Sequence, residues 1–341
     1  MTVPAPRSAR GPVPDCQSGR AQGAKPDLSV TLGPLTLGHP IINASGTMEI
    51  FDLAEVLGPE ILAAPPVAAY VPKTITVDAR AGNRAPRILE TPGGMINAIG
   101  LSGEGLEAFV AHRLPRLLRL PCPLILSVGG FSVEEYVTLA TGLRDALEVT
   151  AGSAWTAKAG LELNISCPNV HSGCASIGGS PGETEAVVGA VRKVWPGLLI
   201  AKLTPNVTDI TAIGRAAEAA GADAIAAVNT YKGLVLDRAT LRPYLGNITG
   251  GLSGPAIKPL ALRAVYELFE TVGIPIIGMG GVATAQDVLE FISCGARAVA
   301  IGSAAFREPL LGARVADELR QALETLNLDL GGLAGRAHSA A

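Results

Sequence analysis

The sequence predicts an α/β fold of the (β/α)8 TIM-barrel class, and three observations indicate it. Short β-rich runs alternate with longer segments whose apolar residues recur at three- and four-residue spacing. The alternation yields eight such runs, the number of strands in a closed barrel. The chain of 341 residues is 48% hydrophobic but only 4% aromatic, which suits tightly packed parallel strands. A doubly wound sheet is the alternative, but no GxGxxG follows the first run.

The expected strands follow an N-terminal β-hairpin. Gly33-Pro34 interrupts the apolar stretch Leu28–Leu37, and a turn between two short strands explains that pattern. The eight barrel strands are then expected at Pro40–Asn43, Val67–Lys73, Leu124–Val128, Leu161–Ile165, Leu199–Leu203, Ala224–Asn229, Pro275–Gly278 and Ala298–Ile301.

Six helices are expected between or after these strands. Asp209 and Thr284 stand near the starts of two of them, where a side-chain oxygen can cap the first backbone N–H groups. The expected helices are Val133–Glu148, Glu183–Val194, Asp209–Ala220, Leu260–Val272, Ala285–Cys294 and Arg307–Leu326.

The two ends of the chain lack this periodic pattern. The first 26 residues hold three arginines against one acid and show no apolar face. Such a start is typical of a disordered or non-native extension, with a transit peptide as the alternative. The expected organisation is an extension over 1–26, one ligand-binding barrel over 27–328 and a disordered tail over 329–341.

Composition excludes several function classes. A net charge of −3 without a basic stripe argues against nucleic acid as a partner. No apolar run reaches 18 residues, so no membrane span is expected. The five cysteines are scattered, with no CxxC, which favours a reducing, cytoplasmic location and argues against a metal or iron–sulfur site within the chain.

Polar and glycine residues collect where the expected strands end. In a barrel the chemistry lies at the C-terminal ends of the strands. Three of the loops that follow are long and glycine-rich, as lids or ligand clamps often are (75–101, 166–182 and 231–257). The strand-end residues are Asn43-Ala44-Ser45-Gly46, Lys73-Thr74, Gly129-Gly130, Asn164 to Asn169, Lys202, Asn229-Thr230, Gly278 to Gly281 and Gly302-Ser303.

The fourth strand end places a cysteine between two asparagines. Residues 164–169 read Asn-Ile-Ser-Cys-Pro-Asn. The thiol can take or give a proton, and each amide can both donate to and accept from a planar, amide-rich ligand. Taken alone, the segment is equally compatible with a polar turn that contains an incidental thiol.

Other strand ends indicate a flavin mononucleotide. Gly280-Gly281 and Gly302-Ser303 follow the seventh and eighth strands, a frequent phosphate site in barrels, and Gly250–Gly254 can add a backbone donor. Lys73 and Lys202 lie on strands, where burial is costly without a partner. An ion pair is the alternative, but the expected strands offer only Glu162 as an acid. FMN would supply both a phosphate and a ring that gains negative charge on reduction.

Together these motifs resemble the class 1, cysteine-dependent dihydroorotate dehydrogenases, from about Leu28 to Leu326. Segments Leu234–Pro243 and Gly250–Pro259 are most similar to the NAD-linked heteromeric branch, in which a separate subunit carries FAD and a [2Fe–2S] cluster. The matching motifs are Lys73-Thr74, Asn97-Ala98-Ile99-Gly100-Leu101, Asn164 to Asn169, Lys202-Leu203-Thr204-Pro205-Asn206, Asn229-Thr230, Gly250 to Pro259 and Gly278 to Gly281.

The resemblance implies FMN-dependent oxidation of dihydroorotate to orotate in pyrimidine biosynthesis, by a homodimer or heterotetramer. Cys167 matches the catalytic base, and flavin N5 accepts the hydride. The residues that match substrate contacts are Lys73, Asn97, Ala98, Ile99, Gly100, Leu101, Asn164, Asn169, Asn229 and Thr230. The residues that match FMN contacts are Ser45, Gly46, Lys73, Thr74, Ser127, Asn164, Lys202, Val228, Gly254, Gly280, Gly281, Gly302 and Ser303.

Two other functions remain open from the sequence: a dihydropyrimidine dehydrogenase-like flavin subunit and a non-catalytic flavin-binding subunit. The electron acceptor is also open. It can be NAD reached through a partner subunit, fumarate, a quinone or another carrier.

Overall fold

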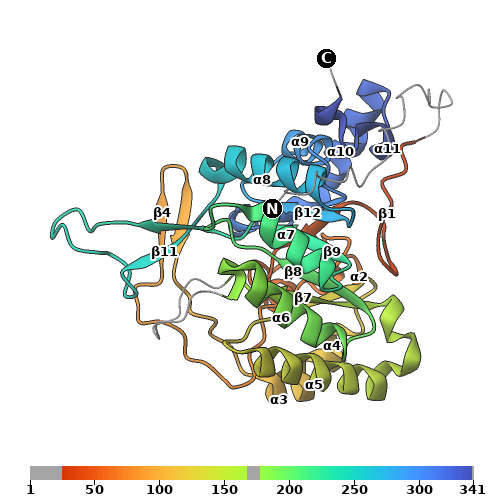
Figure 1. Cartoon of the computed structure of the whole chain (residues 1–341). Coiled ribbons are helices and arrows are strands. Elements are labelled where there is room, and N and C mark those ends of the chain that lie inside the picture. Colours follow the sequence, from red (N-terminus) through yellow and green to blue (C-terminus); the bar gives the residue numbers. More distant parts are fainter. Residues whose placement is uncertain (1–24, 167–176, 340–341) are drawn as a thin grey trace, which may run out of the picture.

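The computed structural model describes residues 25–166 and 177–339, and a curled parallel sheet forms its centre (Figure 1). Its seven strands lie in the order β3-β13-β12-β9-β8-β7-β6, all parallel to their neighbours. They agree with seven of the eight expected strands to within about two residues. Their bounds are β3 (Ile41–Asn43), β6 (Leu124–Val128), β7 (Ala159–Asn164), β8 (Leu198–Lys202), β9 (Ala224–Ala227), β12 (Ile276–Met279) and β13 (Ala298–Ile301).

The segment expected as the second strand, Val67–Lys73, lies between β3 and β6, where an eighth strand would close the barrel. The Ala68 N–H donates to a carbonyl of β3 at 2.9 Å, and two isolated parallel bridges join residues 70–75 to β6. Its pairing is irregular because the Asn43 side chain bonds both the N–H and the C=O of Val71, at 2.8 and 2.7 Å. Pro72 then has no N–H to offer. The segment is extended without being a regular strand.

The expected hairpin closes the N-terminal end of the barrel. β1 (Val30–Leu32) and β2 (Leu35–Leu37) pair antiparallel. Their leucines are fully buried and pack in one cluster with the inward-facing side chains of the barrel strands: Ile125, Leu198, Ile200, Ala224, Ala226, Ile277, Ala298 and Ala300. The floor of the barrel is therefore apolar, which leaves the opposite end for polar chemistry.

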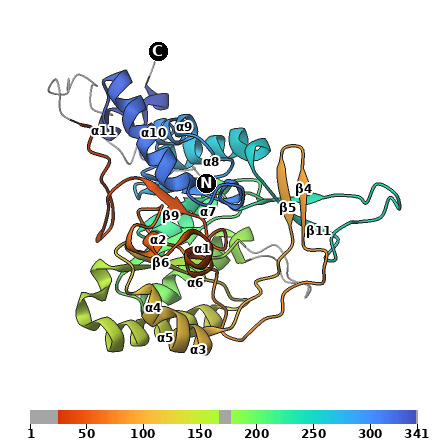
Figure 2. The ribbon, with the colours of Figure 1, turned by 180° about the vertical axis from the view of Figure 1, so that it is seen from behind.

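The six expected helices all form, and Figures 1 and 2 show helices around the outside of the sheet. Asp209 accepts from two N–H groups at the start of α7, and Thr284 forms a capping box with Asp287 at the start of α9. No helix within the described ranges is both long and apolar enough to cross a bilayer. The bounds are α5 (Val133–Ala151), α6 (Pro181–Arg192), α7 (Ile210–Ala219), α8 (Lys258–Thr271), α9 (Ala285–Ser293) and α10 (Leu311–Leu326).

Short helical segments precede α5 that the sequence pattern did not predict. They are α1 (Ile50–Leu57), α2 (Glu60–Ala63), α3 (Leu106–Ala108) and α4 (Leu114–Leu117). α2 is about one turn long, which is too short to show a periodic apolar face. The π-helical turn Phe109–Arg113 joins α3 to α4, and its wider winding breaks the three- and four-residue period.

Two of the long loops form a second sheet, the outer sheet, which projects to one side of the barrel (Figures 1 and 2). The antiparallel order is β10 (Tyr231–Leu234), β11 (Thr249–Ser253), β5 (Gly94–Asn97) and β4 (Ile88–Thr91). The sequence predicted these residues only as loops, because glycines interrupt their alternation. The sheet sets Asn97 in register with Gly251, beside the mouth of the barrel.

The expectation of a disordered tail from residue 329 is wrong for residues 329–339. α11 (Leu330–Leu333) forms a helical turn whose Leu333 is 4% exposed. The Gly335 N–H then donates to the Ile292 carbonyl of α9 at 3.1 Å, and the His338 ring stacks on Tyr266 at a centroid distance of 3.8 Å. The segment is too short and glycine-rich to show periodicity, so packing against α8 and α9 orders it.

Candidate active site

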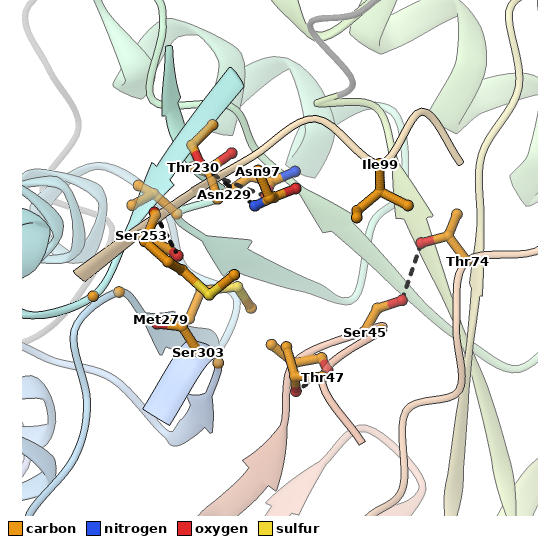
Figure 3. Close-up of a pocket in the computed structure, with 18 of the residues that line it drawn as sticks. Ser45, Thr47, Thr74, Asn97, Ile99, Asn229, Thr230, Ser253, Met279 and Ser303 are labelled. Atoms are coloured by element: carbon orange, nitrogen blue, oxygen red, sulfur yellow. Dashed lines mark hydrogen bonds between the residues drawn. The ribbon is translucent and has the colours of Figure 1, made fainter. Parts of the chain in front are cut away.

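The C-terminal ends of the barrel strands surround a cavity of about 360 Å³ (Figure 3). That volume is within the range of small-molecule sites, roughly 300–1,000 Å³. Most of the residues singled out in the sequence line this one cavity: Ser45, Gly46, Lys73, Thr74, Asn97, Ile99, Gly100, Leu101, Asn164, Lys202, Val228, Asn229, Thr230, Gly254, Gly280, Gly281, Gly302 and Ser303.

Four of the predicted site residues are not among the residues that line the cavity in the described part of the chain. Ala98 is 1% exposed and packs with Ile96 and Leu245 in a small apolar cluster, so its side chain does not line the cavity. Ser127 is fully buried one layer deeper, with its hydroxyl 3.1 Å from that of Thr74. Cys167 and Asn169 lie outside the described residues.

Several residues that contribute to the cavity were not predicted from the sequence. Most are small or apolar and belong to the outer sheet or the strand ends. Their motifs were noted, but nothing in the sequence shows which members of a motif face inward. The additional lining residues are Ala44, Thr47, Ile88, Met95, Gly251, Ser253, Ile257, Met279 and Phe306.

Polar side chains from two strand ends fix one another's orientation. The Asn229 amide donates to the hydroxyl of Ser166, which in turn donates to Asn164 Oδ1 at 2.8 Å. Asn164 Nδ2 donates to Thr74 Oγ1 at 3.3 Å, and Asn229 Oδ1 accepts from the Thr230 N–H at 2.9 Å. Ser166 lies within the cysteine segment but was not predicted to take part. The network holds the amide groups in defined orientations before any ligand binds.

Figure 3 shows how these groups divide the cavity. Asn97, Asn229 and Thr230 lie together on one side, beneath the outer sheet. Ser45 and Thr74 lie on the other side, with their hydroxyls 3.0 Å apart. One side, the amide side, therefore offers two amides together with the Thr230 hydroxyl, whereas Ser45 and Thr74 offer hydroxyls on the other.

The cavity is electropositive. Among the lining residues that the structure describes, Lys73 and Lys202 carry the only charges. The Lys73 side chain lies along Gly46, whose φ is +76°, and a β-carbon on that glycine would be 3.2 Å from Lys73 Cδ. Lys202 does have an acidic partner, because its Nζ lies 3.6 Å from Glu162 Oε1. The ion pair that the sequence analysis treated as the alternative is thus present for this lysine.

Gly254 and Gly281 form one corner of the same cavity, the glycine corner. The φ angle of Gly281 is +77°, and a β-carbon there would lie 2.9 Å from the Gly254 carbonyl oxygen. Side chains at these positions would fill the corner, so only glycine leaves its backbone open to a ligand. Together with Gly302 and Ser303, the corner fits a phosphate group that approaches the backbone closely. The residues present therefore fit FMN.

Comparison with known proteins identifies the family. The family model for dihydroorotate dehydrogenase matches residues 27–323. The chain belongs to the dihydroorotate dehydrogenase family. This finding confirms the family and the dihydroorotate dehydrogenase activity that the sequence motifs indicated.

Similar curated proteins carry the name dihydroorotate dehydrogenase B (NAD(+)), catalytic subunit. The one from Desulforudis audaxviator is 46% identical, covering 92% of this chain and 98% of its own length. The one from Trichlorobacter lovleyi is 44% identical, covering 87% and 93%. These relatives confirm the predicted NAD-linked branch of the family.

A solved structure confirms the fold class. Dihydroorotate dehydrogenase from Eimeria tenella, in complex with ferulenol, superimposes with a TM-score of 0.72. The match covers 94% of this chain and 91% of that one at 22% sequence identity. At this identity the likeness shows the barrel fold alone.

Proposed function

We propose that the cavity holds FMN and dihydroorotate together and oxidises the dihydropyrimidine ring to orotate for pyrimidine biosynthesis. One observation carries the proposal: the amides of Asn97, Asn164 and Asn229 converge on a cavity that also contains two lysines and the glycine corner. Alternating N–H and C=O groups on a pyrimidine ring match amides, because each amide both donates and accepts.

The described residues suggest how FMN would bind. Its phosphate fits the backbone of Gly254 and Gly281 with the Ser303 hydroxyl, and its ring fits beside Lys202. When bound, FMN supplies the acceptor for the hydride that leaves C6 of the substrate. The positive charge of Lys202 would favour the negative charge that the ring gains on reduction.

The substrate would lie against the amide side of the cavity. Asn164 and Asn229 would hydrogen-bond to the ring, and Ser166 holds both amides in the orientation that this requires. The cation of Lys73 complements the carboxylate that distinguishes dihydroorotate from simpler dihydropyrimidines. Holding the ring in one pose fixes which C–H bonds face the base and the hydride acceptor.

Cys167 is the proposed base, although it lies outside the described residues. It follows Ser166 directly, and hydrogen bonds hold the hydroxyl of Ser166 to Asn164 and Asn229, which line the cavity. A thiolate at this position would take the proton from C5 as the hydride leaves C6, which forms the ring double bond of orotate. An ordinary thiol has a pKa of about 8.5, so the rate of proton removal should rise with pH near neutrality.

The test is rapid mixing of the FMN-loaded protein with dihydroorotate. Cys167→Ser should slow flavin reduction at neutral pH by about 100-fold or more while FMN stays bound. Cys122→Ser is the matched control, since the half-buried Cys122 does not line the cavity. An unchanged rate in Cys167→Ser would rule out this residue as the base.

A ligand experiment separates the competing functions. Orotate, but not uracil, should perturb the absorbance spectrum of the bound flavin, because only orotate carries a carboxylate for Lys73. An equal response to uracil would favour the dihydropyrimidine dehydrogenase-like alternative. Flavin reduction by dihydroorotate would exclude a non-catalytic role.

We further infer that electrons leave the chain through a second subunit. The relatives named catalytic subunits imply such a partner. A partner that carries FAD and a [2Fe–2S] cluster, in a heterotetramer built on a catalytic homodimer, would link the reaction to NAD. Copurification from the native source, followed by analysis for FAD and iron, tests this assignment. Recovery of an active enzyme without either group would contradict it.

A further inference from the structure

Glu162 and Lys202 form a buried ion pair behind the wall of the cavity. Their side chains are 5% and 6% exposed, and Glu162 Oε1 lies 3.6 Å from Lys202 Nζ. Within the described part of the chain, Glu162 Oε1 has no hydrogen-bond partner. Lys202 lines the cavity, whereas Glu162 does not. The carboxylate therefore stands behind the lysine as seen from the ligand.

Strand register explains this arrangement. Asn164 of β7 is in register with Lys202 of β8, whereas Glu162 is in register with Ile200. Since alternate residues of a strand share a face, Glu162 points into the barrel one layer below Asn164 and Lys202. Beneath it lies the apolar floor made by the hairpin. The Glu162 carboxylate thus lies between the cavity and the apolar floor of the barrel.

Folding alone does not account for this pair. Both charges lose water on burial, and their attraction offsets that loss only with close geometry and further hydrogen bonds. A separation of 3.6 Å is longer than a charge-assisted hydrogen bond, about 2.7–2.9 Å. The Lys202 ammonium group has three N–H donors, and its position on the cavity wall allows it to donate to a ligand.

We propose that Glu162 is a positioning residue that tunes the flavin through Lys202. Its carboxylate holds the Lys202 ammonium group at the cavity wall. Its negative charge also weakens the attraction between the Lys202 cation and the negative charge of the reduced flavin ring. The reduced flavin is therefore bound less tightly relative to the oxidised form and passes its electrons on more readily. The inference rests on the proposed FMN site.

The test is the midpoint potential of FMN bound to the full-length protein, measured by dye equilibration with a chemical reductant. Glu162→Gln removes the charge and keeps the shape. It should raise the affinity for reduced relative to oxidised FMN roughly tenfold, a positive shift of about 30 mV for a two-electron couple. Lys202→Met should shift the potential in the opposite direction, and the double variant should return toward the wild-type value.

Asp223→Asn is the matched control. Asp223 pairs with Arg192 at 2.8 Å and accepts from the Leu199 N–H, near the opposite end of β8. This variant should lower stability without shifting the potential, so the readout separates tuning from a merely structural role. Fluorescence titration of the apoprotein with FMN gives the affinity of each variant independently of turnover.

The outcomes are distinct. An unshifted potential in Glu162→Gln, with FMN bound, overturns the tuning role alone. If Glu162→Gln does not retain FMN, Glu162→Met replaces it, because it also removes the charge: a positive shift supports the proposal, and no shift overturns it. Failure of the wild-type protein to bind FMN overturns both proposals. Failure of dihydroorotate to reduce the flavin overturns only the proposed function, because the potential is measured without substrate.

Discussion

Gly251 lies directly against the side chain of Thr230. A β-carbon on residue 251 would be 1.9 Å from Thr230 Oγ1, far closer than any non-bonded contact. The Gly251 carbonyl also accepts from Asn97 Nδ2 at 3.4 Å. The outer sheet is therefore held against the amide side of the cavity at a point where only glycine fits.

Gly251→Ala should lower kcat/KM for dihydroorotate at least tenfold, because the Thr230 side chain must move to admit the methyl group. The FMN content should stay unchanged, since the glycine corner is built from other residues. Steady-state kinetics with flavin quantification checks this. Gly233→Ala on the neighbouring β10 is the control, because its β-carbon would come closest to the flexible end of Ile96, at 3.3 Å, and would make an ordinary 3.9 Å contact with the Leu252 β-carbon. Equal losses in the two variants would contradict the prediction.

Ser166 couples the two amides that are proposed to bind the substrate ring. Ser166→Ala removes its hydrogen bonds to Asn164 and Asn229 and leaves both amides less ordered. Two such bonds contribute about 1–2 kcal/mol in total, so KM for dihydroorotate should rise about 5- to 30-fold. Thr325→Ala is the control, because that hydroxyl only bonds a carbonyl of its own helix. A wild-type KM for Ser166→Ala would show that the amides hold their orientation without it.

The barrel could be predicted from the sequence because its strands are buried on both faces. Such strands appear as continuous apolar runs, and Leu124–Val128 was predicted to the residue. The outer sheet could not, since its strands are half exposed and interrupted by glycines such as Gly250 and Gly251. Their pairing joins segments about 150 residues apart in the chain, which no local pattern records.

The site could be predicted only to the level of motifs. Strand ends identified the cavity, but the direction of each side chain did not follow from them, so Ala98 and Ser127 were assigned contacts although their side chains do not line it. The pairing of Lys202 with Glu162 depends on the register between β7 and β8. Ser166 takes part because its hydroxyl reaches two strand ends at once.

Thiol chemistry should distinguish Cys167 from the described cysteines. Burial raises the pKa of Cys122 to about 11, and burial likewise raises the pKa of Cys294. At pH 8 a thiol with a pKa of 11 is only about 0.1% thiolate, the reactive form. Iodoacetamide should therefore inactivate the enzyme by modifying Cys167, and orotate should slow the loss. Peptide mass spectrometry checks the site, and Cys122→Ala should be inactivated at the same rate. Inactivation that follows Cys122 modification would contradict the prediction.

His39 should make stability fall in mild acid. Its Nδ1 accepts the Ile41 N–H at 3.3 Å, and burial, assisted by the charge of Arg320, lowers its pKa to about 4 against the opposing charge of Asp317. Above pH 6.5 the ring is neutral in both states. Between pH 6.5 and 4 the unfolded chain binds the proton and the folded chain does not, so the free energy of unfolding falls by up to about 3 kcal/mol.

Urea denaturation at pH 7.5 and 5 should show a smaller loss of unfolding free energy for His39→Gln than for the wild type. The exposed His112→Gln should behave as wild type, and equal losses in all three proteins would contradict the assignment.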